Sequence, residues 1–579
     1  MEVDECSGEN HERQIVNSIG GFVRKVDDMK RLHRFLVLGC ESPTYYIGER
    51  LLGIENATAI TNLLKDGKGV QVVNDIRRYS IEGRTVKQNP IMLALALCAR
   101  TSDLATKRRA YEVLPEVCRI PTHLFMFIGY CQTFSSLNGE QTTGWGRAHR
   151  NAIKKWYISN SKKDPMKLAT NITKYQKREG WSHRDVARLM HLKPTGQDVC
   201  EELGVMMRYV ARGWNKVVEV YCSQDTGEPH IINGESTNAV LQFLRAVENV
   251  KGMTAADELE VVQFICNHNL VREHIPTQCL NSVEVWRALL TNMPMKAMIQ
   301  SLGKMTSVGL LNEHNVIALD MVCKRLRDWR MLKNARLHPL NVLFAWKTYK
   351  NGRGYVGKLR WTPNGDIVNA LEEALYLSFK HVESTKKRHL LAIDVSVEMS
   401  DVSCASKPFI TPCFASAVMA MVVAKTESDH HFVAFSDRIV PLTINENITL
   451  NQVLHAMASV PGRERSLLGQ GLDAKASVPI PMGGTDCALP MLYAIENNLA
   501  VDVFVVYTDC ETRTVTMQPS AALKQYRRHS GIRDAKLIVV NMTSNGFTFA
   551  DPDDPGMFDM AGFDCDAPQV MREFILGDI

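Results

Sequence analysis

Apolar residues recur with a helical period along most of the chain between Gly20 and Val382. Two consecutive stripes show the pattern clearly, with Pro294 between them and Gly303 after the second: Trp286, Leu289, Leu290 and Met293, then Met295, Met298, Ile299 and Leu302. Each stripe repeats at i, i+3, i+4 and i+7, which predicts a helix with one buried face. The proline predicts a break, and the glycine predicts the end of the second helix. Many such pairs in series predict an α-solenoid of the HEAT kind with degenerate repeats.

The pattern changes at His389. Short apolar runs of the kind buried in parallel sheets follow one another: HLLAIDV, HFVAFS, VDVFVVYT and AKLIVVN. Helical patterns lie between them, at about 411–426, 449–459, 487–498 and 519–529. Strands that alternate with helices predict a doubly wound α/β domain. We therefore predict a multidomain chain with a polar tail at 1–19, a helical-repeat domain at 20–385 and an α/β domain at 386–579.

One segment of the α/β region breaks the pattern. Residues 461–482 are rich in Gly, Pro, Arg and Ser and have no periodicity, which predicts a surface loop. The loop contains Gly469-x-Gly471-x-x-Ala474, but no strand precedes it, so this partial match to a dinucleotide fingerprint is interpreted as chance. No phosphate-binding P-loop motif occurs in the sequence.

Composition and charge divide the chain in the same way as the pattern. The 579 residues are 45% hydrophobic and 23% charged, which are ordinary globular values for several packing units. Residues 1–390 carry 55 Lys and Arg against 40 Asp and Glu, whereas residues 391–579 carry 13 against 23. A basic part favours a polyanionic partner, and an acidic part favours cations. The bland alternative is two solvated surfaces of unequal composition.

The sequence also bears on compartment. The fifteen cysteines are scattered and include no C-x-x-C pair, which favours reduced thiols in the cytoplasm, with the nucleus as a second compartment. The first residues are polar and acidic, unlike a secretory signal. The longest apolar run, near Ala415 to Ala424, is well short of the roughly 20 residues that span a bilayer, so no membrane segment is predicted.

Oxygen-bearing side chains follow the strands of the predicted α/β domain. The first strand runs into Asp394-Val-Ser396-Val-Glu398, the strand VFVVYT is followed by Asp509, and Gly483-Gly484-Thr485-Asp486 precedes a helix. Ligands of open α/β sheets bind at the carboxyl ends of strands, and hard oxygen ligands suit Mg²⁺. The arrangement resembles the metal-ion-dependent adhesion site of von Willebrand factor A domains.

By that resemblance, Asp394, Ser396, Thr485 and Asp509 are the metal ligands, and one coordination position is left for an acidic protein ligand. Glu398 departs from the pattern, because the family has a second Ser there. A carboxylate at this position could neutralise the cation that an acidic partner needs. The alternative is that Asp394 and Asp509 only cap the sheet edge, without a metal.

Two consecutive helical patterns of the basic part carry aligned cations. In the first, from Pro165 to Arg178, Leu168, Ile172 and Tyr175 predict the buried face, and the cations fall within about 40° of one another: Lys167, Lys174 and Arg178. Gly180 predicts its end, and Ser182 to Asp185 resembles a capping box for the next helix. In this second helix the recurring cations are Arg184, Arg188 and His191.

A third group lies upstream, where Arg147, Arg150, Lys154 and Lys155 occur with Trp145, Trp156 and Tyr157. Cations neutralise phosphates and flat rings stack on unpaired bases, so this composition favours single-stranded or looped RNA. The alternative is that the cations are solvated and that Trp145 and Tyr175 belong to the core.

Longer strings resemble one family closely. The sequence is similar to the Ro autoantigen family, in which a TROVE domain precedes a von Willebrand factor A domain, and the similarity runs from about residue 15 to the end. The strings that carry it are RLHRFLVLGCESPTYYI from Arg31, CRIPTHLF from Cys118, GWSHRD and HLKP around His191, LGKMT from Leu302 and MTSNGFTFADPDD from Met542. The polar N-terminus, the insertion at 461–482 and Glu398 depart from the family.

The resemblance implies a non-enzymatic protein of a small ribonucleoprotein. It implies a closed ring of helical repeats, Y RNA-like small non-coding RNAs bound on a basic outer surface, and single-stranded ends of misfolded RNAs captured in a central hole for RNA quality control. The family's Y RNA-binding positions correspond to Lys174, Arg178 and His191. Two alternatives stay open: a metal-dependent phosphohydrolase, which would need a second Asp where Ser396 stands, and a protein-interaction scaffold without RNA.

Overall fold

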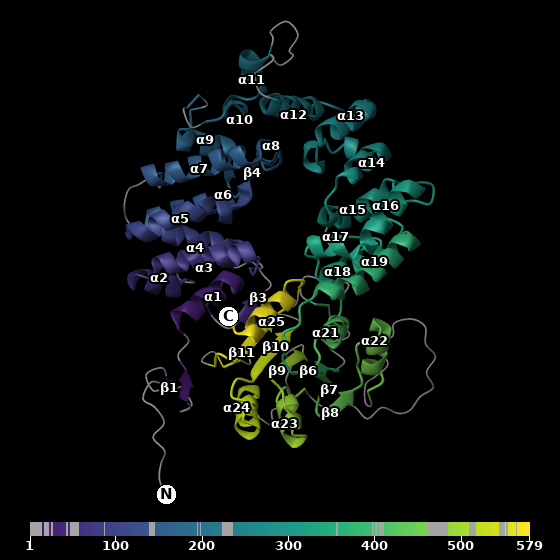
Figure 1. The fold of residues 1–579 in the computed structure, drawn as a ribbon. Coiled ribbons are helices and arrows are strands. Elements are labelled where there is room, and N and C mark those ends of the chain that lie inside the picture. The colour runs from purple at the N-terminus through teal and green to yellow at the C-terminus, as the bar shows by residue number, and fades with distance from the viewer. Residues whose placement is uncertain are drawn as a thin grey trace. The chain divides into compact units, whose positions relative to one another are not determined.

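The computed structural model describes most of the chain, and Figure 1 draws its helices and strands. The described residues are 14–16, 22–24, 27–41, 44–46, 57–85, 87–137, 145–193, 195–196, 199–222, 235–354, 357–396, 399, 403–404, 410–460, 485–508, 517–542, 550–551, 554–562 and 564–579. Contacts divide the chain into two compact units. Unit 1 holds residues 1–51, 323–358 and 365–579, and unit 2 holds residues 52–322 and 359–364.

Unit 2 is built from consecutive helices, as the apolar periodicity predicts. Along the chain they are α2 (Thr58–Lys65), α3 (Gly69–Glu82), α4 (Asn89–Arg100), α5 (Leu104–Val117), α6 (Pro121–Leu137), α7 (Arg147–Lys163), α8 (Pro165–Lys174), α9 (His183–Met190), α10 (Glu201–Arg212), α11 (Trp214–Tyr221), α12 (Glu235–Lys251), α13 (Glu258–His268), α14 (Val283–Thr291) and α15 (Met295–Ser307). Short 3₁₀ turns lie between some of them at Ala255–Asp257, Arg272–His274 and Cys279–Asn281. Most of these helices pack on helices one or two places away in sequence, as in a solenoid, and α8 packs in addition on α12.

The predicted helix pair around Pro294 is present as α14 and α15, and the proline lies between them. The prediction that Gly303 ends the second helix is wrong, because α15 continues to Ser307. A Cβ atom on Gly303 would lie 2.6 Å from Cζ3 of Trp361. The glycine therefore makes room for an indole ring that packs directly on the helix backbone, and it is not a cap.

Unit 1 contains a seven-stranded sheet in the order β3-β11-β10-β9-β6-β7-β8. All neighbours pair in parallel except β7 and β8. The strands are β3 (Thr44–Tyr46), β6 (His389–Asp394), β7 (His430–Phe435), β8 (Ile439–Leu442), β9 (Val503–Thr508), β10 (Lys536–Asn541) and β11 (Met557–Ala561). Along the chain, the helices that lie between and after these strands are α21 (Pro412–Thr426), α22 (Leu450–Ala458), α23 (Leu489–Glu496), α24 (Pro519–Ser530) and α25 (Ala567–Leu576). This is the predicted doubly wound α/β architecture.

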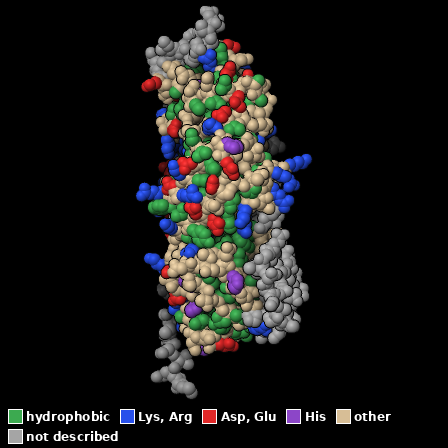
Figure 2. All heavy atoms as spheres, turned by 90° about the vertical axis from the view of Figure 1, so that its right-hand side faces the viewer, with side chains coloured by type: hydrophobic (Ala, Val, Ile, Leu, Met, Phe, Trp, Pro, Cys, Tyr) green, Lys and Arg blue, Asp and Glu red, His purple; other side chains and the backbone are tan. Residues whose placement is uncertain are grey.

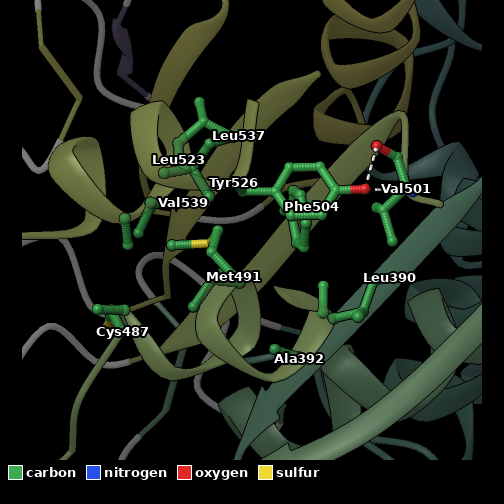
Figure 3. Packing of buried hydrophobic residues seen from close by; sticks show 14 of the residues in the cluster. Leu390, Ala392, Cys487, Met491, Val501, Phe504, Leu523, Tyr526, Leu537 and Val539 are labelled. Carbon is green, nitrogen blue, oxygen red and sulfur yellow. Dashed lines mark hydrogen bonds between the residues drawn. The ribbon is translucent and has the colours of Figure 1, made fainter. Parts of the chain in front are cut away.

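One core of unit 1 lies between the sheet and helices α23 and α24. Figure 3 shows Tyr526 of α24 in this core, next to Phe504 of β9. The two rings meet edge to face with centroids 4.8 Å apart. The Tyr526 hydroxyl donates to the carbonyl oxygen of Leu499 and accepts from the backbone N–H of Val501. Strands β6 and β9 are buried along their whole length, which explains why their sequences read as continuous apolar runs.

The compact units do not follow the linear boundary predicted near residue 385. Helix α1 (Asp28–Leu38) and strand β3 come from the N-terminal region, yet β3 pairs with β11 near the end of the chain. The Tyr45 hydroxyl donates to Asp564 at 3.0 Å. Helices α17 (Trp329–Asn334), α18 (Pro339–Lys350) and α19 (Gly365–Ser378) also belong to unit 1, whereas α16 (Val316–Arg327) crosses the division. Short segments such as β3 carry no pattern that reveals a partner so distant in sequence.

Unit 1 also contains a short strand pair near the N-terminus and a 3₁₀ turn. Strands β1 (Gln14–Val16) and β2 (Phe22–Arg24) pair in antiparallel fashion, and a 3₁₀ turn spans Phe379–His381. None of the described helices combines the length and the hydropathy needed to cross a bilayer.

Candidate functional site

The first cationic segment has a different backbone from the predicted one. Helix α8 ends at Lys174, and the chain then forms a small hairpin of β4 (Lys177–Arg178) and β5 (Trp181–Ser182). Glu179 and Gly180 at its turn have φ of 52° and 76°, and two left-handed residues reverse a chain tightly. The prediction that Arg178 shares a helical stripe with Lys167 and Lys174 is therefore wrong. Lys167 is exposed on the helix, while Arg178 is exposed on the hairpin and donates to the carbonyl oxygen of Lys177 at 2.7 Å.

Lys174 and Arg178 nevertheless flank the same ring. The Lys174 Nζ atom lies 5.5 Å from the centroid of the Tyr175 ring, and the Arg178 Cζ atom lies 6.0 Å from it. Tyr175 is half-buried at the C-cap of α8, so its predicted place on the fully buried face holds only in part. The hairpin thus keeps the two cations close together, although by another geometry than the one predicted.

Lys174 also has an acidic partner that the sequence does not reveal. Its Nζ atom lies 3.3 Å from Oε1 of Glu273, in the 3₁₀ turn after α13. Burial alone would raise the pKa of Glu273, but a backbone hydrogen bond and the Lys174 ammonium outweigh it and hold that pKa below its usual value. Next to Glu273, the ring of His274 meets the hydroxyl of Thr173 on α8 at 3.0 Å. The contact between His274 and Thr173 therefore holds the turn that carries Glu273 against α8.

The second cationic segment is helix α9, and its predicted start is confirmed. Ser182 accepts from the backbone N–H of Asp185, and the Asp185 carboxylate accepts from that of Ser182, which completes a capping box. Arg184 and Arg188, one turn apart, are both exposed. His191 is exposed too, but it is the C-cap with φ of 55° and does not continue the helical face. The stripe is thus two arginines on the helix and a histidine at its end.

The structure changes the interpretation of the upstream group, which combines cations with aromatic rings. Arg147 is exposed and Arg150 is half-buried at the start of α7, so these cations remain accessible. Trp145, Trp156 and Tyr157 are buried, which leaves none of the three rings free to stack on a base. The Trp156 indole donates to the carbonyl oxygen of Cys118 at 2.6 Å, and the Tyr157 hydroxyl meets Nδ1 of His183 at 2.7 Å. The aromatic residues of this group are scaffold.

Two buried histidines belong to that scaffold. Burial lowers the pKa of His183, the first residue of α9, to about 3. Burial, and then the Arg100 guanidinium, lower the pKa of His149 on α7 to about 3. Both rings are therefore neutral near pH 7, and both pack on aromatic rings such as Phe125 and Trp145.

Charges of both signs are mixed on one face of the molecule. On the face that Figure 2 shows, lysine and arginine side chains alternate with acidic ones and with exposed apolar atoms. The net basic charge of the first two-thirds of the sequence is therefore no guide to a binding surface by itself. The candidate surface is instead defined by α8, the hairpin and α9, which carry Lys167, Lys174, Arg178, Arg184, Arg188 and His191 within one short stretch of chain.

The second candidate site lies at the carboxyl end of β6. The Asp394 carboxylate is fully buried; Oδ1 accepts from the backbone N–H of Ser396 at 2.8 Å, and Oδ2 accepts from the hydroxyl of Thr485 at 3.2 Å. The hydroxyl of Thr508, the last residue of β9, donates to the same Oδ2 at 3.0 Å. Three of the predicted ligands are thus together, as the sheet topology requires. Glu398 and Asp509 lie outside the described residues, as do Gly483, Gly484 and the loop at 461–482.

The donor set fits a hard cation. Carboxylate and hydroxyl oxygens are the groups that Mg²⁺ takes, and the Ser396 hydroxyl oxygen is buried without a hydrogen-bond partner among the described residues. A cation would satisfy that oxygen. In the part of the chain that the structure describes, no three His, Cys, Asp or Glu residues cluster as a metal site.

Sequence reasoning missed two residues of these sites. Thr508 immediately precedes Asp509, so its position at the strand end was a usable signal. Glu273 is distant from Lys174 in sequence, and no pattern connects the two residues. Contacts of this second kind depend on how the helices stack.

Comparisons with known proteins cover almost the whole chain. The family model of the TROVE domain matches residues 15–353, and that of the Ro60 vWA domain matches residues 388–468 and 463–575. The chain is 36% identical to RNA-binding protein RO60 of Caenorhabditis elegans, over 98% of this chain and 90% of the relative. It is 33% identical to RNA-binding protein RO60 of Deinococcus radiodurans, over 98% and 96%. The crystal structure of the Deinococcus radiodurans RO (RSR) protein superposes with a TM-score of 0.79 at 31% identity, covering 96% of this chain and all of that one.

Proposed function

The chain belongs to the Ro60 family of RNA-binding proteins, and from this premise we propose that it binds structured small non-coding RNAs of the Y RNA type on α8, the β4-β5 hairpin and α9. The observation that carries the proposal is the grouping of cations on these three consecutive elements, where Lys174 is half-buried and the others are exposed: Lys167, Arg178, Arg184, Arg188 and His191. Phosphate contacts from such side chains position an RNA, whose looped bases then supply specificity. The prediction of a non-enzymatic protein agrees with the relatives, which are named for RNA binding.

His191 provides a test of this surface. It is exposed at the end of α9, and its side chain carries no helix packing, so a His191→Ser variant should keep the fold. We expect it to bind a structured small RNA more weakly and to bind a single-stranded RNA tail with almost unchanged affinity. Filter binding of both RNAs to the same protein preparation measures the difference. Equal loss for both RNAs would contradict a surface reserved for structured RNA.

We propose further that single-stranded ends of misfolded non-coding RNAs bind in a central hole of a helical ring, which would serve RNA quality control. This part is supported by the resemblance to the Ro family alone, and the closed ring stays a prediction. An RNA with a free single-stranded end should bind better than a blunt duplex, whose bases cannot be splayed for stacking. Equal affinity for the two would contradict it.

At the sheet edge we propose that Asp394, Ser396 and Thr485 hold Mg²⁺, with Asp509 as the fourth predicted ligand. The support is that the Asp394 carboxylate accepts from the Thr485 hydroxyl and from the backbone N–H of Ser396, whose own hydroxyl oxygen is buried without a hydrogen-bond partner among the described residues. Anomalous scattering from crystals grown with Mn²⁺ should place an ion within about 2.0–2.3 Å of at least two of these oxygens. Occupation of the site by the Glu398 side chain would overturn the proposal, and with it the binding of an acidic protein ligand.

A further inference from the structure

Trp329, the first residue of α17, is unusual among the aromatic residues that the structure describes because it is 39% exposed. Tryptophan normally buries most of its surface, so an exposed indole needs a reason. The short helix is anchored by Leu332, which is fully buried, and it packs on α19. The exposed ring is therefore carried by a fixed element of unit 1 (α17 in Figure 1).

Two cations lie close to this ring. The Arg330 Cζ atom lies 5.8 Å from the Trp329 ring centroid, and the Lys333 Nζ atom lies 6.0 Å from it. Both side chains belong to exposed residues, and neither has an ion pair within the described residues. The segment from Lys324 to Arg336 carries six basic residues and one acidic residue. The local surface is thus an indole within a concentrated positive charge.

The acidic groups nearby are already engaged. The Asp328 carboxylate accepts from the backbone N–H groups of Arg330 and Met331, at 2.8 and 3.4 Å, and so caps α17. Glu373 of α19 makes two hydrogen bonds to the Arg327 guanidinium, at 2.8 and 2.9 Å. Neither carboxylate faces Arg330 or Lys333 in an ion pair, so these two charges remain available to an anionic ligand.

We infer that Trp329, Arg330 and Lys333, here called the Trp329 patch, form a second RNA-contacting surface that stacks an unpaired base on the indole and binds the adjacent phosphates. The inference rests on the proposed RNA binding and adds a separate place for it, because α8, the hairpin and α9 belong to unit 2. Single-stranded nucleic acid is recognised by this combination of a flat ring and flexible cations, without dependence on sequence. A folded protein partner would find the same surface highly charged and poor in apolar area.

The test uses the full-length protein and a short fluorescent oligouridine, which has no secondary structure. Replacing Trp329 with Ala should weaken its binding about fivefold to tenfold, the lower part of the range for a stacked base, because only part of the indole is exposed. Trp329→Phe keeps a flat ring and should bind within about twofold of the unmodified protein. The joint variant Arg330→Ala, Lys333→Ala should reduce the slope of log affinity against log salt by about 1.4, since each single-strand phosphate contact contributes about 0.7.

The matched control is Arg528→Ala. Arg528 is an exposed cation on α24, in the same unit but outside the patch, and its removal should leave the salt slope unchanged. Hydrogen exchange in α17 and α19 checks that each variant keeps the local fold. Should Trp329→Ala unfold α17, the comparison of the double cation variant with Arg528→Ala still decides the question.

Three outcomes distinguish RNA binding by the Trp329 patch from RNA binding by the protein as a whole. Weaker oligouridine binding by Trp329→Ala, together with retention by Trp329→Phe, supports the patch. Unchanged affinity and salt slope in all patch variants overturns the patch, but leaves RNA binding by the unmodified protein in place. If the unmodified protein binds neither oligouridine nor a structured small RNA, the proposed function itself fails.

Discussion

The cationic surface of unit 2 and the oxygen cluster of unit 1 are organised on opposite principles. On α8, the hairpin and α9 the functional side chains are exposed, except for the half-buried Lys174, and they stand on a buried scaffold that includes Trp156, Tyr157 and His183. At the end of β6 the central group, Asp394, is itself fully buried, and its partners come from three separated parts of the chain. The first region should therefore tolerate substitution of its binding residues, whereas the second should not.

The largest difference is expected from Asp394→Ala. The substitution leaves the Thr485 and Thr508 hydroxyls and the Ser396 N–H without their acceptor in a buried place, which should cost unit 1 about 3 kcal/mol of stability. Region-resolved hydrogen exchange should show faster opening of β6 and β9, with α8 and α9 unaffected. Asp394→Asn keeps one acceptor oxygen and should lose less. Equal exchange in Asp394→Ala and the unmodified protein would show that the cluster is not structural.

The scaffold of unit 2 should respond to acid. His149 and His183 have folded pKa values of about 3, below the usual 6.5, because burial disfavours the charged ring. Between pH 6.5 and 3 the unfolded chain binds protons that the folded chain does not, so stability falls as the pH falls. Each histidine should remove about 2 kcal/mol by pH 5.

Hydrogen exchange of α7 and α9 between pH 7 and 5, corrected for the intrinsic rate, measures this effect. A His183→Gln variant lacks one of the titrating rings and should show a shallower pH profile in α9. A profile that stays equally steep in this variant would mean that other groups determine the acid response.

Removing two cations from the exposed region should alter binding and leave the fold intact. For Lys174→Ala combined with Arg178→Ala, we expect the slope of log affinity for a structured small RNA against log salt to shrink by between about one and two units. Stability should change by no more than about 0.5 kcal/mol, because neither side chain is buried. Unchanged affinity and salt slope would assign the contacts to Arg184 and Arg188 instead.

The smallest effect concerns the ion pair between Lys174 and Glu273. Its carboxylate competes with RNA phosphate for the Lys174 ammonium, so Glu273→Gln should strengthen the binding of a structured small RNA about twofold to threefold, in line with the weak energy of exposed pairs. In the Lys174→Ala background the same substitution should have no effect. A gain of equal size in both backgrounds would point to the general loss of a negative charge.

The sequence predicted the two regions to different depths, for physical reasons. Parallel strands bring their carboxyl ends to one edge, so Asp394 and Ser396 could be placed at that edge from the pattern, and the resemblance to the von Willebrand factor A metal site added Thr485. A helical wheel assumes that the helix continues, and this assumption failed at Tyr175, where the chain leaves α8 for the hairpin. The turn residues Glu179 and Gly180 were the available signal. Pairing of β3 with β11 and of Lys174 with Glu273 depends on tertiary packing, which has no local pattern.

We propose above that this chain binds small non-coding RNA through the cations of α8, the hairpin and α9. The most direct measurement is ultraviolet crosslinking of the full-length protein to RNA in cells, followed by sequencing, with the Lys174→Ala, Arg178→Ala variant at equal abundance as the comparison. If these cations bind the RNA, structured small non-coding RNAs should dominate the RNA crosslinked to the unmodified protein and should be strongly depleted from the variant. Recovery of the same RNAs in the same amounts by both proteins would contradict it.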